Sequence, residues 1–201
     1  MEQLLLNIEL PVQKTFDNFI VGNNKECFDS LKQFILPNND IFFIYLWGEE
    51  GSGKSHIVEA IKKNNISTIE DIDKANEIEQ IKIFNLYNEH KASKRKLLVT
   101  GNNNPKKMML RDDLSSRLSW GLVYKLNLLQ DKEKKLALKQ YSKDKGINLK
   151  NEIIEYLLRY FKRDLPSLLA TIDALDRWSL KTKRPITIPL LKDMIQKDIF
   201  N

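Results

Sequence analysis

Apolar runs and helical patterns alternate through the first two thirds of the chain, and turn signals separate them. Four short apolar runs predict buried strands, at residues 41–47, 66–69, 96–100 and 123–126. Apolar residues at helical spacing predict helices over about 25–34, 55–62 and 74–90. Because strands and helices alternate, we predict an α/β fold in which helices flank a parallel sheet.

Beyond residue 130 the apolar period is helical throughout. Two apolar stripes predict helices within 153–161 and 165–175, and a third helix is expected to begin near Thr187, with Pro189 in its first turn. We therefore expect three parts: an N-terminal peptide at 1–12, an α/β core at 13–128 and a small all-α domain at 129–201.

The eight residues from Gly48 to Ser55 lie between a predicted strand and a predicted helix, as in a phosphate-binding loop. Glycines let backbone N–H groups close around phosphate oxygens, a lysine reaches the outer phosphates, and a serine hydroxyl is placed for Mg²⁺. The residues expected to act in this way are Gly48, Gly51, Ser52, Gly53, Lys54 and Ser55. Glu49 and Glu50 are expected to point to solvent. The alternative is a turn that binds nothing.

Polar residues follow the next two predicted strands. Glu70 and Asp71 end the strand at 66–69, where acidic residues can hold Mg²⁺ and orient an attacking water. Alternatively these acids only favour the start of the next helix, with Asp73 as its cap. Asn102 follows the strand at 96–100, where its amide can hydrogen-bond a γ-phosphate or the attacking water, although asparagine is also common in turns.

Composition narrows the class of protein. The 201 residues are 42% hydrophobic and 30% charged, as in soluble globular proteins, and no apolar run approaches the roughly 18 residues of a membrane helix. The N-terminus resembles no signal peptide, so we expect a cytoplasmic protein. A single cysteine, Cys27, excludes an internal disulfide and a cysteine-built metal site. His56 and His90 have no partner at ligand spacing and are expected to be ordinary helix residues.

The formal net charge of +6 is unevenly distributed. Residues 1–100 carry a net charge of −3, whereas residues 101–201 carry +9. A basic half can contact DNA or an acidic partner, but lysines on amphipathic helices more commonly form a solvated face. The lysines in question are Lys132, Lys134, Lys135, Lys139, Lys143 and Lys145. Weak DNA contact and a solvated face both stay open, as does self-association.

The segment from Ser116 to Gly121 resembles the Ser-Arg-Leu/Phe-x-Trp-Gly signature of the DnaA family of AAA+ replication initiators. This resemblance implies that Arg117 is a catalytic finger that acts in trans, on the nucleotide of a neighbouring subunit. It extends over nearly the whole chain and implies a bound nucleotide, ADP or ATP. By resemblance, the family's nucleotide-binding residues fall on Ile20, Val21, His56, the polar sensor Asn102 and the lid arginine Arg163.

Two features resemble Hda, the regulatory inactivators of DnaA, more than the initiators themselves. The sequence ends at Asn201, soon after the predicted lid helices, without a helix-turn-helix module. The N-terminus is similar to the peptide with which Hda proteins bind the sliding clamp, and an alternative is a first strand or an unstructured end. The residues of this peptide are Gln3, Leu4, Leu5, Leu6 and Ile8. The resemblance implies that the chain, with the DNA-loaded clamp, promotes hydrolysis of ATP bound to DnaA.

The sequence departs from the DnaA pattern in two places. Only residues 62–65 separate the helix after the phosphate loop from the acidic strand, where the family has another strand and helix. We therefore expect a shortened AAA+ sheet that lacks one edge strand. Glu70 also stands where aspartate is usual, which weakens the prediction of an Mg²⁺ site at Ser55, Glu70 and Asp71. An autonomous ATPase of the helicase-loader type and a nucleotide-free scaffold are the rival hypotheses.

Overall fold

Four parallel strands form the sheet of the core, and the computed structural model describes residues 12–198. The strands are β1 (Phe43–Trp47), β2 (Ser67–Ile69), β3 (Leu97–Gly101) and β4 (Leu122–Lys125). Each predicted strand is confirmed, with ends that differ by one or two residues. The order is β2-β3-β1-β4, and within the described residues nothing pairs with the outer side of β2. The expected shortened sheet is therefore confirmed.

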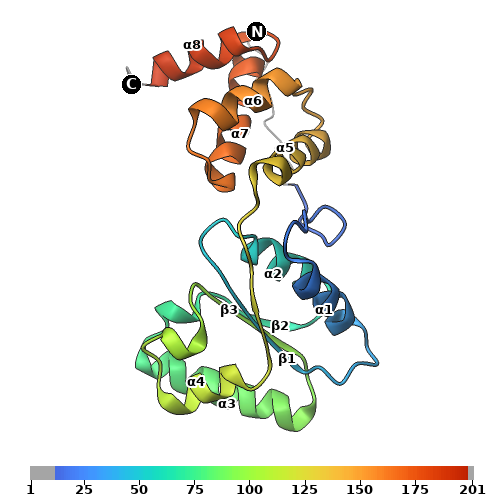
Figure 1. Ribbon diagram of the computed structural model, residues 1–201, viewed down its shortest axis with the longest axis vertical. Helices are drawn as coiled ribbons and strands as arrows, with labels where there is room; N and C mark the ends of the chain where they lie inside the picture. Colours follow the sequence, from blue (N-terminus) through green and yellow to red (C-terminus); the bar gives the residue numbers. More distant parts are fainter. Residues whose placement is uncertain (1–11, 199–201) are drawn as a thin grey trace, which may run out of the picture.

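Helices cover both faces of this sheet (Figure 1). The first pair, α1 (Lys25–Ile35) and α2 (Lys54–Lys62), packs on Ile44 and Leu46, whereas α3 (Glu77–Ser93) and α4 (Asp112–Ser119) pack on Phe43 and Tyr45. Successive residues of a strand point to opposite faces, so a strand buried on both faces is apolar at every position, as the run at 43–47 is. The predicted α/β class is confirmed.

Two short 3₁₀ turns, η1 (Ile72–Lys74) and η2 (Pro105–Lys107), follow β2 and β3. Helix α3 begins after η1, and its cap is Asn76, whose side chain accepts a hydrogen bond from the backbone N–H of Glu79. Glu79 in turn accepts from the N–H of Asn76, which completes a capping box. The suggestion that Asp73 caps this helix is therefore wrong, because Asp73 has a different partner.

The C-terminal part, here called the lid, consists of four helices (Figure 1). They are α5 (Asp131–Asp144), α6 (Asn151–Tyr160), α7 (Leu165–Thr182) and α8 (Ile188–Asp198). Their apolar side chains form a cluster of their own, separate from the two clusters of the core. Thr187 Oγ1 accepts a hydrogen bond from Leu190 N at 3.3 Å, as predicted for a cap. Across residues 12–198 no helix combines the length and the apolarity that a bilayer crossing requires.

The connection from core to lid is fixed by a pair of asparagines. The buried Asn24, just before α1, donates through Nδ2 to Asn127 O at 3.1 Å and accepts through Oδ1 from Asn127 N at 2.7 Å. Asn127 lies just after β4, where the chain leaves the sheet for the lid. A buried amide with its partners in place holds one arrangement of the backbone. This contact therefore sets where the lid begins.

Candidate functional site

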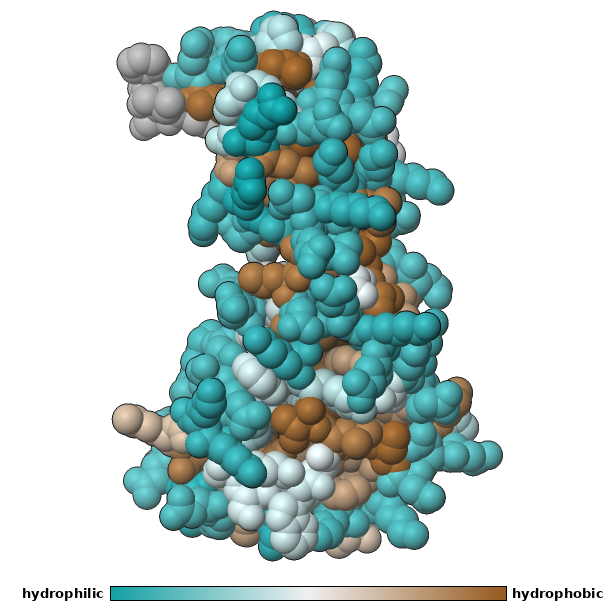
Figure 2. Space-filling model, in the orientation of Figure 1, coloured by the Kyte–Doolittle hydropathy of each residue, from teal (hydrophilic) through white to brown (hydrophobic). Residues whose placement is uncertain are grey.

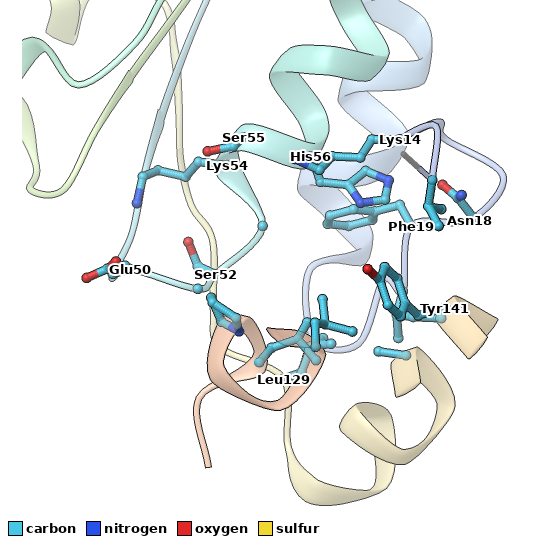
Figure 3. A pocket seen from close by; sticks show the side chains of 18 of the residues that line it. Lys14, Asn18, Phe19, Glu50, Ser52, Lys54, Ser55, His56, Leu129 and Tyr141 are labelled. Carbon is cyan, nitrogen blue, oxygen red and sulfur yellow. The ribbon is translucent and has the colours of Figure 1, made fainter. Parts of the chain in front are cut away.

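A cavity of about 700 Å³ lies between the phosphate loop and the lid, a size common for small-molecule sites (Figure 3). Its walls come from the segment before α1, the loop at 48–55, the ends of β2 and β3, and helices α5 and α7. In Figure 3, Lys54 and Glu50 lie on one side, whereas Phe19, His56 and Tyr141 lie on the other. Apolar residues gather at the constriction between core and lid (Figure 2).

The phosphate loop has the backbone that its glycines predict. Gly51 and Gly53 have φ values of 81° and 102°, a region that other residues rarely adopt. At Gly53 a Cβ would also meet the Phe19 ring at 2.9 Å, and at Gly48 it would meet Leu126 O at 2.5 Å. Helix α2 starts at Lys54, so its first N–H groups face the cavity, as anion sites require. Glu49 and Glu50 are exposed, as expected.

Two polar side chains of the loop are buried beside the cavity. Lys54 Nζ donates to Gly48 O at 2.5 Å and to Glu49 O at 3.1 Å, and burial lowers its pKa. Ser52 is 4% exposed, and within the described residues its Oγ has no hydrogen-bond partner. A buried hydroxyl without a partner costs free energy that a bound phosphate oxygen would recover. The loop therefore fits an anionic group.

Aromatic residues form the opposite wall of the cavity. Phe19 stacks on Phe28 with ring centroids 5.5 Å apart, and its edge contacts His56 at 5.3 Å. His56 Nε2 lies 2.8 Å from Thr15 O, and burial lowers the pKa of the imidazole. Ile20 lines the cavity as predicted, whereas Val21 is not among the lining residues. This aromatic wall is suited to contact with a planar ring such as a nucleobase.

The acidic pair after β2 points in two directions. Glu70 Oε1 lies 2.8 Å from Lys62 Nζ, and Glu70 does not line the cavity. Asp71 lines it, but its Oδ2 lies 2.6 Å from Lys74 Nζ. No group of three or more metal-ligating side chains occurs within residues 12–198. Of the three predicted Mg²⁺ ligands only Ser55 and Asp71 line the cavity, and Asp71 is paired with Lys74, so the predicted set of three is not brought together.

Asn102 reaches the cavity in the predicted place, but Asp73 holds it there. The Asp73 carboxylate accepts from Asn102 N at 2.5 Å and from Asn102 Nδ2 at 2.7 Å. The backbone N–H and the side-chain Nδ2 of Asn102 therefore have an acceptor, and Oδ1 of the amide can accept a hydrogen bond from another group. The sequence did not predict this contact, nor that Lys74 would line the cavity. The spacing of three residues between Asp71 and Lys74 was the one local sign that the two could form an ion pair.

The lid meets the phosphate loop without a cation. Arg163 does not line the cavity: its Nε donates to Leu158 O at 3.1 Å, and its Nη1 lies 3.5 Å from Asp131 Oδ2. Pro166 takes the place nearest the loop, with Cδ 3.1 Å from where a Cβ of Gly51 would lie. The lid side chains that line the cavity are Ala137, Gln140, Tyr141, Asp144, Leu165, Pro166 and Leu169.

Arg117 lies on α4, across the sheet from α1 and α2, and does not line the cavity. Its guanidinium carbon is 5.2 Å from the centroid of the Trp120 ring and 5.8 Å from that of Phe84. Lys91 Nζ lies 5.0 Å from the same Trp120 ring, which is 66% exposed. Throughout the described part of the chain, no carboxylate lies within 4.0 Å of the Arg117 guanidinium. Arg117 is thus a half-buried cation beside two aromatic rings, on the face of the sheet away from the cavity.

The remaining predicted sites are a peptide and a basic surface. Gln3, Leu4, Leu5, Leu6 and Ile8 lie outside the described residues. In the basic half, Lys134, Lys135 and Lys145 each lie within 4.0 Å of a carboxylate. Weak DNA contact by this half stays a prediction.

Comparison with known proteins identifies the lid. Residues 131–195 match the family model described as "Hda, lid domain". The helical domain is similar to the lid of Hda. The fold of the chain is similar to that of domain III of the Thermotoga maritima replication initiation protein DnaA, over 92% of this chain and 96% of that chain. The TM-score is 0.82 and the sequence identity is 16%.

Two further structures share the fold. AMPPCP-bound DnaA from Aquifex aeolicus has a TM-score of 0.69 and 21% identity, over 85% of this chain and 66% of that chain. The Thermotoga maritima RuvB Holliday junction branch migration motor has a TM-score of 0.70 and 12% identity, over 92% and 72%. The predicted AAA+ fold with a helical lid is confirmed, and so is the resemblance to Hda and DnaA.

Proposed function

We propose that this chain is an Hda-type negative regulator of replication initiation. It holds a nucleotide in its own cavity and supplies Arg117 to ATP bound by the initiator DnaA. The Hda lid and the DnaA-like core support a role at the initiator, because proteins of one fold can assemble through equivalent surfaces. The protein acts in the cytoplasm, where the replication machinery is found.

The observation that carries this proposal is the position of Arg117. An arginine that neutralises charge on a transferring phosphoryl group must touch that group. Arg117 is separated from its own cavity by the sheet, is presented by Trp120, and has no carboxylate partner within the described residues. It can therefore serve only a nucleotide held by another molecule.

Nucleotide binding in the chain's own cavity is supported by the loop. The glycine conformations, the unpartnered Ser52 Oγ and the N-terminus of α2 together suit a phosphate chain. The similar Aquifex aeolicus DnaA carries AMPPCP. The altered acidic pair supports weak or absent hydrolysis by the chain itself. The bound nucleotide then stabilises the arrangement of core and lid.

Recruitment through the sliding clamp belongs to the same proposal. An extended peptide with a glutamine and several leucines suits a shallow apolar pocket on a partner. We assign this contact to residues 3–8, which include Gln3 and Ile8. Gln3→Ala is expected to abolish retention of the chain by immobilised clamp while its circular dichroism spectrum stays unchanged.

The test of the proposal is hydrolysis of DnaA-bound ATP in the presence of DNA-loaded clamp. Arg117→Ala is expected to lower the stimulated rate on the order of a thousandfold, the effect of losing a finger. Arg111→Ala is the matched control, because Arg111 directly precedes α4 but pairs with Asp113 at 2.9 Å. Equal rates for the two variants would refute the assignment of Arg117.

A further inference from the structure

We propose that Lys74 is the second phosphate-binding cation of the cavity and takes the place of a divalent metal, so that a nucleoside diphosphate binds without Mg²⁺. This inference rests on the nucleotide binding of the proposed function. It concerns how the anionic charge is neutralised, which the phosphate loop alone does not determine.

The backbone at Lys74 is anchored to the end of β3. The preceding residue, Asp73, accepts two hydrogen bonds from Asn102, and Lys74 N donates to Asp71 O at 2.9 Å within η1. A glycine at 101 is required for this approach, since a Cβ there would lie 2.6 Å from Asp73 Oδ1. Lys74 therefore starts from a fixed point at the edge of the cavity, although its side chain is exposed.

Asp71 and Lys74 form an ion pair where a metal would need a free carboxylate. The Lys74 ammonium lies 2.6 Å from Asp71 Oδ2, and this hydrogen bond raises the pKa of the lysine. A magnesium ion at Asp71 would share its carboxylate with the Lys74 ammonium and lie beside that positive charge. Since Glu70 is turned toward Lys62, no second carboxylate of the predicted pair is available. A lysine already in this place supplies positive charge without a metal.

Lys54 and Lys74 both line the cavity. Burial lowers the pKa of Lys54 and the charge of Lys74 adds a smaller effect in the same direction, whereas Asp71, Asp73 and Glu50 act in the opposite direction. Two ammonium groups that repel each other across a cavity are both stabilised by an anion between them. The α- and β-phosphates of a nucleotide provide such an anion.

The lid limits this site to two phosphates. Among residues 12–198, the lid side chains that line the cavity carry no positive charge, and Pro166 is the one that packs against Gly51. Of the other basic lining residues, Lys14 lies 2.5 Å from Glu59 and His56 has a lowered pKa. A γ-phosphate would add charge without adding a partner, so the diphosphate is the better ligand.

Isothermal titration of the full chain with ADP, in excess EDTA and in excess Mg²⁺, tests the inference. The wild type is expected to bind equally well in both buffers, and Lys74→Gln to bind roughly tenfold more weakly in EDTA, as expected when one charge-assisted hydrogen bond is lost. Lys62→Gln is the matched control, because Lys62 forms the equivalent ion pair with Glu70 outside the cavity. Equal affinities of the two variants would overturn the inference.

A second variant distinguishes charge neutralisation by Lys74 from charge neutralisation by a bound metal ion. Asp71→Asn removes the carboxylate that a metal would need but leaves Lys74 in place, so ADP binding is expected to persist in both buffers. Binding by the wild type only with Mg²⁺, and its loss in Asp71→Asn, would refute the role of Lys74 and leave nucleotide binding intact. No binding by the folded wild type in either buffer would refute both proposals. Thermal denaturation of each variant verifies folding.

Discussion

The lysines at the cavity and the arginine on α4 differ in the groups of the chain that contact their positive charge. Lys54 donates to carbonyls of its own loop, and Lys74 pairs with Asp71. Arg117 lies beside the rings of Trp120 and Phe84, and within residues 12–198 it meets no carboxylate. Lys54 and Lys74 have polar partners within the chain when no ligand is bound. Arg117 has no anionic partner within the described residues, so its charge is available to an anion on another molecule.

This difference separates two uses of positive charge on one AAA+ core. In the proposed function, the cavity residues hold a nucleotide that stabilises the chain, and Arg117 stabilises charge that develops on the initiator's nucleotide. Substitutions at one region are therefore expected to leave the other unchanged. The following substitutions examine that separation.

The largest effect in this set is expected from Asp73→Ala. Removal of this carboxylate leaves Asn102 N–H and Nδ2 without their acceptor, so the free energy of unfolding should fall by about 1–2 kcal/mol. Urea denaturation measures the change. Asp113→Ala, which breaks the exposed pair with Arg111, should lower the free energy of unfolding by less, because water screens a surface ion pair. Equal losses would show that Asp73 does not anchor the end of β3.

Trp120→Ala is expected to have a smaller effect, confined to the α4 region. Loss of the ring that orients Arg117 should lower stimulated hydrolysis by DnaA about two- to fivefold, the size of an exposed cation–π contact. ADP affinity should stay at the wild-type value, because Trp120 does not line the cavity. Trp120→Phe should restore part of the rate. A change in ADP affinity in either variant would argue against two independent regions.

The smallest effect concerns pH and the aromatic wall. Burial lowers the pKa of His56 below its ordinary 6.5, so the unfolded chain takes up a proton first as the pH falls. The contribution of the neutral His56 to the free energy of unfolding is therefore fully present above about pH 6.5, and it is lost as the pH falls through the lowered pKa. Urea denaturation across this range should show a shallower pH dependence for His56→Gln than for the wild type. Identical slopes would contradict the assignment.

Most of the fold and the phosphate loop could be predicted because their signals are local. The strand at 43–47 is apolar without interruption, and the glycines of the loop stand at fixed spacing from Lys54. The contact of Asp73 with Asn102 joins residues that are 29 positions apart in the sequence, so no local sequence pattern predicts it. Asp73 therefore appeared to be a helix cap.

The lid shows a second limit of sequence reasoning. Arg163 resembles the family's lid arginine in type, but α7 begins at Leu165, and the residue that faces Gly51 is Pro166. Pro166 is three residues after Arg163, and a difference of this size at the start of a helix decides which side chain contacts the loop. Lys74 was missed for a similar reason, since only the folded chain places the ion pair with Asp71 at the cavity.

The most direct test of the central claim is to locate the ATP that is hydrolysed. Labelled ATP is bound to DnaA in advance, free nucleotide is removed, and a single turnover is followed with DNA-loaded clamp and the purified chain. We expect the label on DnaA to become ADP, and the chain alone to hydrolyse ATP at a negligible rate. Rapid hydrolysis by the chain without DnaA, or conversion of DnaA-bound ATP at the same rate by Arg117→Ala, would contradict the claim that the chemistry takes place on the partner.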